Sequence, residues 1–248
     1  MAWDSKLYVQ KIILNREDVP TFKEYPFNIN VIKNFSELEI DTPVTFLVWE
    51  NGIGKSTFIE TLAVSVGLNP EGGTQIFNFS TVSTHSNLSE YLTVPRYGKP
   101  KTKFFLRAES FYNVLSEIQH LSEEPGLGGS LYDSYGGNLH ECSHGVSFIK
   151  LVQNRFTDYG LYILDEPEAA LSPQRQMSLL YLINELVKDG SQFIIATHSP
   201  ILISYVKGKI LDLNNNFEEI KYEDTEIYQT YKMYLNNPYG MQKRLFDE

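Results

Sequence analysis

The sequence predicts an α/β fold in which a mixed, mainly parallel sheet is flanked by helices. Three apolar runs have the length and the β-branched content of buried strands: 44–48, 161–164 and 192–196. Apolar residues at helical spacing follow the first run, and a second helical pattern spans Pro173 to Lys188. Each strand ends in a polar group of residues, which is where an open parallel sheet binds its ligands.

The first strand is followed by a glycine-punctuated loop and then by the start of a helix. This order gathers free backbone N–H groups and the positive end of a helix dipole around one point, which attracts phosphate. Lys55 adds a positive charge for the β- and γ-phosphates, and the Ser56 hydroxyl is of the kind that ligates Mg²⁺. The residues predicted to contact the nucleotide here are Asn51, Gly52, Ile53, Gly54, Lys55, Ser56 and Thr57.

Trp49 departs from the usual phosphate-loop pattern, which begins with a small residue at this place. If the backbone there needs a positive φ, a residue with a side chain costs about 1–2 kcal/mol. That cost corresponds to a nucleotide affinity lower by about 5- to 30-fold. The indole displaces the loop, blocks the site or packs over the loop harmlessly, and the sequence leaves these alternatives open.

The other two strands end in Asp165-Glu166 and in Thr197-His198, so their side chains are expected to converge with Lys55 on one nucleotide. Asp165 would hold Mg²⁺ opposite Ser56, and Glu166 would orient or deprotonate the attacking water. His198 would form a hydrogen bond with the γ-phosphate. The alternatives are a solvated acidic turn and a structural histidine.

Composition narrows the class of protein. The 248 residues are 42% hydrophobic and 21% charged, which is ordinary for a globular α/β domain. The absence of a long apolar stretch and of a signal peptide argues against membrane insertion and export. The single cysteine, Cys142, excludes an intrachain disulfide and fits a reducing cytoplasm.

A net charge of −10 disfavours an extended nucleic-acid footprint. One segment, from Arg96 to Arg107, concentrates basic residues, and we interpret it as a solvated hairpin face or, less readily, as a nucleic-acid contact.

The remaining helices and strands are expected in chain order. They are strands at 7–14 and 35–40 with an extended segment at 25–29 between them, short strands and a hairpin within 74–108, and a helix from Phe111. A glycine-rich loop at 123–138, a helix beginning near Ser147, an edge hairpin at 210–213 and 217–221, and a helix at 225–235 follow.

Taken together, the motifs resemble those of the ATP-binding-cassette (ABC) class of P-loop NTPases. NGIGKST is similar to the Walker A loop, LYILDEPEAALS to Walker B with its following loop, and THSP to the switch histidine. CSHGVS looks like the signature motif, and Glu109 stands at the place of the Q-loop residue, where glutamate is atypical. The resemblance implies one ABC-type ATPase domain over 1–248, with an N-terminal antiparallel β part and a small helical subdomain at about 110–156. It also implies ATP and Mg²⁺ as cofactors, with Ser56, Asp165 and Glu109 as the metal-binding residues.

The resemblance further implies a head-to-tail homodimer that sandwiches two ATP molecules. Ser143 and Gly145 of one chain would bind the γ-phosphate held by the other. Val146 replaces the expected Glu or Gln, so with Trp49 there are two departures at nucleotide-contacting positions. The signature contains SHG where transporters have LSGGQ. In this respect the sequence is similar to the small soluble AAA-type ATPases of the RecF- and SMC-like group, which includes recombination and anti-phage ATPases.

Three functions follow as alternatives. The first is a cytoplasmic, Mg²⁺-dependent ATPase that dimerises on ATP and switches a partner protein, with a link to DNA or to anti-phage defence. The second is the ATP-binding subunit of an ABC transporter, acting with a separate membrane protein. The third is a nucleotide sensor whose hydrolysis is weakened by Trp49 and Val146.

Overall fold

The computed structural model describes residues 7–49, 54–70, 72–73, 87–123, 137, 139 and 142–246, with only the backbone at 121–123. Three predicted features lie outside these residues: Asn51, Gly52 and Ile53 of the phosphate loop, the segment 74–86, and most of the glycine-rich stretch 123–138. Within the described part, no helix combines the length and the apolarity needed to cross a lipid bilayer.

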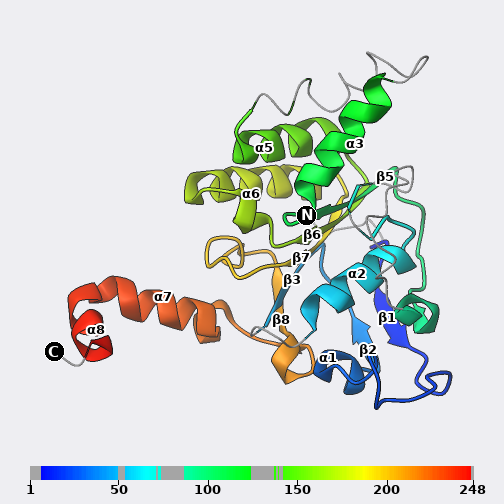
Figure 1. Ribbon diagram of the computed structural model, residues 1–248, viewed down its shortest axis with the longest axis horizontal. Helices are drawn as coiled ribbons and strands as arrows, with labels where there is room; N and C mark the ends of the chain where they lie inside the picture. The colour runs from blue at the N-terminus through cyan, green and yellow to red at the C-terminus, as the bar shows by residue number, and fades with distance from the viewer. Residues whose placement is uncertain are drawn as a thin grey trace.

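A six-stranded sheet forms the centre of the fold, as the sequence predicts (Figure 1). Its strand order is β5-β6-β7-β3-β8-β9, and every neighbouring pair is parallel except β8 and β9. The strands are β5 (Thr102–Arg107), β6 (Gly160–Asp165), β7 (Gln192–Ala196), β3 (Val44–Val48), β8 (Lys209–Asp212) and β9 (Glu218–Glu219). All residues of β3, β6 and β7 are buried, which explains why these strands are continuous apolar runs in the sequence.

A second, antiparallel sheet of order β2-β1-β4 is the predicted N-terminal β part. Its strands are β1 (Lys11–Leu14), β2 (Glu37–Glu39) and β4 (Leu92–Thr93), with the 3₁₀ helix η1 (Asn87–Tyr91) before β4. The strand predicted to begin at Leu7 therefore begins later, at Lys11. Before it, Val9 forms an isolated β-bridge to Arg96. The extended segment predicted at 25–29 is wrong, because these residues form turns that lead into helix α1 (Asn30–Lys33).

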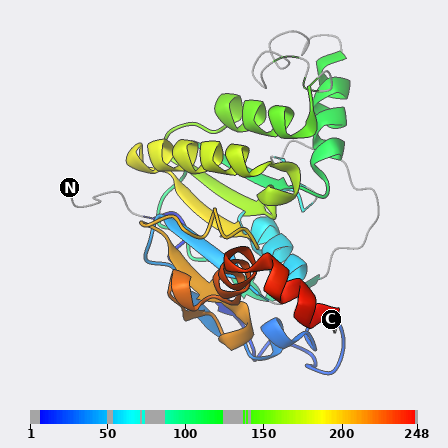
Figure 2. The same cartoon turned by 90° about the vertical axis from the view of Figure 1, so that its left-hand side faces the viewer.

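Helices cover both faces of the central sheet (Figures 1 and 2). On one face, α2 (Lys55–Ser65) and the antiparallel sheet enclose a core that includes Phe58 and Leu62. On the other face, α3 (Phe111–Glu123), α5 (His144–Arg155) and α6 (Pro173–Lys188) enclose a second core. The helix predicted near Ser147 begins three residues earlier, at His144, because Ser143 has the extended backbone of an N-cap.

Two helices end the described chain and project from the sheet layers (Figure 1). The helix predicted at 225–235 is α7 (Glu226–Asn236), and the sequence reading missed the helix after it, α8 (Pro238–Leu245). Neither helix has a buried residue. Helix α8 was missed because a helix that does not pack on a core needs no apolar stripe, and that stripe is the pattern by which helices are predicted. Short 3₁₀ helices complete the structure: η3 (Pro167–Ala170), η4 (Leu213–Asn215) and η5 (Tyr222–Asp224).

Candidate nucleotide-binding site

The site lies at the carboxyl ends of three adjacent strands, β6, β7 and β3. Helix α2 follows β3 and begins at Lys55, so its N-terminus lies at this edge of the sheet (Figure 1). The residue before it, Gly54, has φ of +99°. A Cβ at Gly54 would lie 1.9 Å from Cγ2 of Ile29. Both the backbone conformation and the available space therefore require glycine here.

The Gly54→Ala substitution is expected to destabilise the protein. The left-handed backbone costs about 1–2 kcal/mol, and the overlap with Ile29 adds about 1–3 kcal/mol. Gly67→Ala at the other end of α2 is the matched control, because Gly67 also has a positive φ (+78°) but its Cβ would meet only the flexible end of Lys103. Urea unfolding of both variants measures the difference, and equal losses of stability would contradict the close packing at Gly54.

Lys55 is the centre of a buried charge network. Its Nζ lies 2.8 Å from Oδ1 of Asp165 and 2.6 Å from Oε1 of Glu166. Asp165 is 3% exposed and Lys55 is 7% exposed, so water has little access to this ion pair and weakens its attraction only slightly. Burial raises the pKa of Asp165, and the charges of Lys55 and Arg107 oppose that rise. The predicted meeting of the phosphate-loop lysine with the strand-end acids is present in the structure.

Arg107 extends this network on the other side of Asp165. It ends β5, the strand next to β6, and its Nε lies 3.3 Å from Oδ2 of Asp165. Its terminal nitrogens lie 3.3 Å from Glu60 and 3.4 Å from Glu109. The sequence reading placed Arg107 in the basic segment and missed this contact. Its position at the end of an apolar strand is visible in the sequence, but the pairing that brings it level with Asp165 is seen in the structure.

His198 lies against the indole of Trp49, with ring centroids 4.1 Å apart in an edge-on arrangement. The same indole lies 4.6 Å from Nζ of Lys55. Burial lowers the pKa of His198, against the opposing charge of Glu166, so the imidazole is neutral at pH 7. Its Nε2 is buried and has no hydrogen-bond partner among the described residues. A buried polar nitrogen without a partner is unusual, and a bound ligand, ion or water is one explanation for it.

Trp49 itself is buried, and its backbone is not among the described positions with positive φ. The backbone strain considered for this residue therefore does not arise. The indole packs in the core on the α2 side of the sheet and also forms one wall of the site, next to Lys55 and His198.

Glu168 holds the loop that carries His198. Its carboxylate accepts a hydrogen bond of 2.7 Å from the Thr197 hydroxyl and another from the backbone N–H of His198. Burial raises the pKa of Glu168, and these two hydrogen bonds oppose the rise. Glu168 was not predicted from the sequence, because Glu166, which directly follows Asp165, was predicted to be the functional acid.

Glu166 has a left-handed backbone, with φ of 49°, where β6 passes into η3. Residues other than glycine adopt this region rarely, and such outliers concentrate at functional positions. Its N–H donates to the carbonyl of Ala196 on β7, which fixes the turn against the neighbouring strand. This backbone sends the Glu166 carboxylate to Lys55, while 41% of its side chain stays exposed to solvent.

Ser143 and Gly145 lie at the start of α5, on the opposite side of the sheet from α2. Ser143 is exposed, whereas Gly145 is buried, and a Cβ on it would lie 2.8 Å from the carbonyl oxygen of Ala170. Among the described residues, no hydrogen bond or ion pair joins either of them to Lys55. The structure thus brings Lys55, Asp165, Glu166 and His198 together and leaves the two signature residues apart.

The residues present fit a magnesium nucleotide. Gly54 leaves a side-chain-free N-terminus on α2, and His198 Nε2 lacks a partner. The described residues contain no group of three or more His, Cys, Asp or Glu side chains that could hold a metal alone. Proteins typically bind Mg²⁺ through one or two carboxylates together with substrate phosphates. Glu109 is exposed and reaches Asp165 only through the Arg107 guanidinium.

Comparison with known proteins gives one family match and several relatives. Residues 143–203 match the model of an AAA ATPase domain. The chain is 26% identical over 230 residues to the lipoprotein-releasing system ATP-binding protein LolD of Buchnera aphidicola subsp. Acyrthosiphon pisum, covering 82% of this chain and 92% of LolD. It is 24% identical over 203 residues to the phosphate import ATP-binding protein PstB of Oceanobacillus iheyensis, covering 74% and 72%.

Two solved structures are similar at low sequence identity. cbiO1 from Clostridium perfringens, part of the ABC transporter complex cbiONQ, has a TM-score of 0.47 at 15% identity and covers 98% of this chain and 100% of its own. The SMC head domain from Thermotoga maritima has a TM-score of 0.43 at 15% identity and covers 83% and 95%.

The fold and the site define a P-loop nucleotide-binding protein. Lys55 follows β3, Asp165 ends β6 and His198 follows β7, and these three parallel strands are neighbours in the sheet. The family match and the sequence relatives are to ATP-binding proteins of this kind, so the chain is similar to ABC-class P-loop ATPases, in agreement with the resemblance drawn from the motifs.

Proposed function

We propose that this chain binds Mg²⁺-ATP in the cytoplasm and hydrolyses it as a head-to-tail dimer that drives or switches a partner protein. The observation that carries this proposal is the convergence of Lys55, Asp165 and Glu166 at the N-terminus of α2, with His198 beside them. In this proposal Lys55 would supply the cation, Asp165 the carboxylate that binds the metal and Glu166 the proton acceptor, which are the groups that phosphoryl transfer to water requires.

Lys55 has to exchange partners when the nucleotide binds. Its ammonium is held by Asp165 and Glu166 at hydrogen-bond distance, and phosphate oxygens would replace at least one of these carboxylates. Mg²⁺, when bound, supplies positive charge next to the phosphates, and Ser56 and Asp165 would hold it, with Glu109 as a more distant candidate. The exchange frees the Glu166 carboxylate.

Glu166 then acts as the general base toward water. Its partial exposure gives water access, and its left-handed backbone keeps the carboxylate on the nucleotide side of η3. The neutral His198 presents the unpartnered Nε2 to the γ-phosphate. Glu168 is a positioning residue, because it fixes the Thr197-His198 backbone rather than contacting the nucleotide.

A second chain would complete the site. Ser143 is exposed at the N-terminus of α5, so it is available to the γ-phosphate of a partner, and α3 and α5 would form the helical subdomain of about 110–156. Asn51, Gly52, Ile53, Gly54 and Thr57 would contribute the remaining nucleotide contacts from the chain that carries Lys55.

The partner distinguishes two versions of the proposal. The relatives named above are ATP-binding proteins of a lipoprotein-releasing system and of phosphate import, which favours a transporter subunit. The SHG signature favours a soluble switch of the RecF- and SMC-like group instead. Co-purification with an integral membrane protein supports the transporter subunit. DNA binding that weakens with salt through the segment from Arg96 to Arg107 supports the switch.

Nucleotide titration of the purified protein tests the proposal. A Trp3→Phe background leaves Trp49 as the single tryptophan. Its emission is expected to change on addition of Mg²⁺-ATP, because binding draws Lys55 away from the indole that it now contacts. The same samples are assayed for phosphate release. Binding without release indicates the nucleotide sensor, and absence of both contradicts the proposal.

A further inference from the structure

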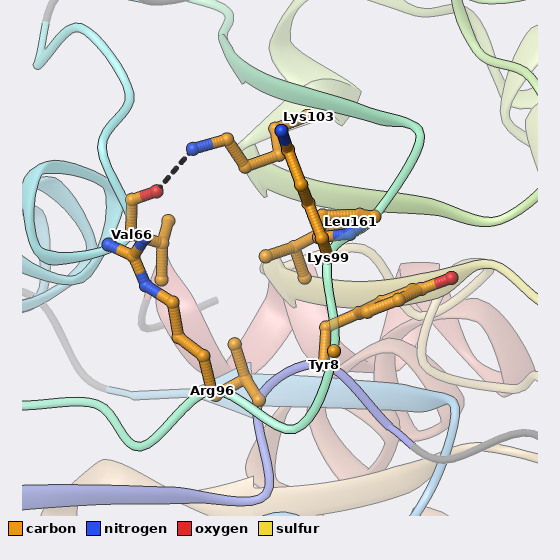
Figure 3. Close-up of a pocket in the computed structure, with 9 residues that line it drawn as sticks. Tyr8, Val66, Arg96, Lys99, Lys103 and Leu161 are labelled. Atoms are coloured by element: carbon orange, nitrogen blue, oxygen red, sulfur yellow. Dashed lines mark hydrogen bonds between the residues drawn. The ribbon is translucent and has the colours of Figure 1, made fainter.

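A cavity of about 300 Å³ opens at the edge of the sheet opposite the nucleotide site. It lies beyond the C-terminal end of α2, whose 11 residues separate it from Lys55 by about 16 Å at 1.5 Å per residue. Figure 3 shows basic side chains and the Tyr8 ring around it. Its lining residues are Tyr8, Val9, Val66, Arg96, Gly98, Lys99, Pro100, Lys103 and Leu161.

Three cations line this cavity: Arg96, Lys99 and Lys103 (Figure 3). No carboxylate is among the lining residues, and none of the three cations forms an ion pair within the described chain. Burial lowers the pKa of Lys103, and the charges of Arg96 and Lys99 lower it further. In a protein with a net charge of −10, three like charges around one hollow leave a local excess that an anion would offset.

Capping of α2 accounts for only part of this arrangement. Nζ of Lys103 lies 2.6 Å from the carbonyl oxygen of Val66, and Nη2 of Arg96 lies 3.2 Å from that of Ser65. Cations at a helix C-terminus satisfy free carbonyls and the negative end of the dipole. Lys99 has no such contact, since no hydrogen bond or ion pair joins it to the described residues. Capping also leaves the cavity open.

The remaining walls are apolar. Val9, Pro100 and Leu161 line the cavity, and the Tyr8 ring is part of the same lining (Figure 3). Ligand pockets combine apolar walls with a few convergent polar groups, and 300 Å³ is at the small end of their range. The cavity therefore matches a small molecule that has a flat apolar body and a charged end, and it is too small to enclose a nucleic-acid duplex.

We propose that this cavity binds a small phosphate ester, with its phosphate held by Arg96, Lys99 and Lys103 and its apolar body against Tyr8 and Leu161. Arginine and lysine together suit a phosphate, because they supply charge-assisted hydrogen bonds from several directions. The site is separate from the nucleotide site and does not depend on the proposed ATPase activity.

Calorimetric titration with phenyl phosphate tests the site. Inorganic phosphate tests the contact with the cations alone, and benzyl alcohol tests the contact with the apolar walls alone. Phenyl phosphate is expected to bind more tightly than either. Lys99→Gln is expected to weaken its binding about tenfold or more, since it removes one charge-assisted contact. Lys99 is exposed and has no described partner, so this variant is expected to keep the wild-type thermal unfolding temperature.

Lys101→Gln is the matched control. Lys101 is an exposed lysine two residues further on, but it pairs with Asp158 and does not line the cavity. Its variant is expected to bind phenyl phosphate as the wild type does. Equal binding of benzyl alcohol and phenyl phosphate, or wild-type affinity in Lys99→Gln, would overturn the proposal. So would a single-stranded oligonucleotide that displaces phenyl phosphate and is weakened equally by both lysine variants, because that result identifies a nucleic-acid surface.

Discussion

The Glu166→Gln variant is expected to bind ATP and to hydrolyse it about 10²–10⁴-fold more slowly than the wild type. The amide keeps the size of the side chain and an oxygen that accepts from Lys55, 2.6 Å away in the wild type. It cannot take up a proton from water at neutral pH. Single-turnover phosphate release, measured beside nucleotide affinity, separates the loss of the chemical step from a loss of binding.

The same variant should accumulate a dimer with ATP, because separation of the two chains would follow hydrolysis. Size-exclusion chromatography with and without ATP measures this accumulation. Glu185→Gln is the control, since Glu185 is a partly exposed acid of α6 that pairs with Lys188. An unchanged rate in Glu166→Gln would mean that another group activates water. A variant that binds ATP and stays monomeric would contradict the head-to-tail dimer.

The central sheet was predictable because its strands are buried on both faces. Such strands are continuous apolar runs, and β3, β6 and β7 carry no exposed residue that would interrupt the pattern. Helix α6 was predicted at its observed bounds, since Pro173 follows an N-cap serine and a glycine follows the C-cap. The extended reading at 25–29 failed because Pro26 excludes helix before it but does not distinguish a strand from a turn.

Only part of the candidate site could be predicted from the sequence, namely the residues that follow buried strands and are brought close together by the parallel sheet. Lys55, Asp165 and His198 each follow a buried strand, so a parallel sheet brings them to one edge whatever their side chains do. The contact of Arg107 with Asp165 depends on β5 pairing with β6, which the sequence does not state. The packing of Trp49 on His198 and the hydrogen bonds of Glu168 are likewise contacts between distant segments.

The Asp165→Asn variant is expected to lower the free energy of unfolding by about 3 kcal/mol, the lower end of the range for breaking a buried ion pair. Burial raises the pKa of Asp165, so its charge is costly to bury by itself. The loss arises because Lys55 and Arg107 stay in place without the carboxylate that they share. It is limited because Lys55 keeps Glu166 and Arg107 keeps its other carboxylates.

Urea unfolding followed by circular dichroism measures this loss, provided that the slope of the transition stays constant between variants. Asp158→Asn is the matched control, because the same substitution removes an acid from an exposed pair with Lys101. Solvent screens that pair, so its unfolding midpoint should move little. Equal shifts in the two variants would mean that water reaches the Lys55 network. Nucleotide phosphates would then compete with water as well as with Asp165 and Glu166 for the lysine, and the exchange of partners proposed for binding would lose its physical basis.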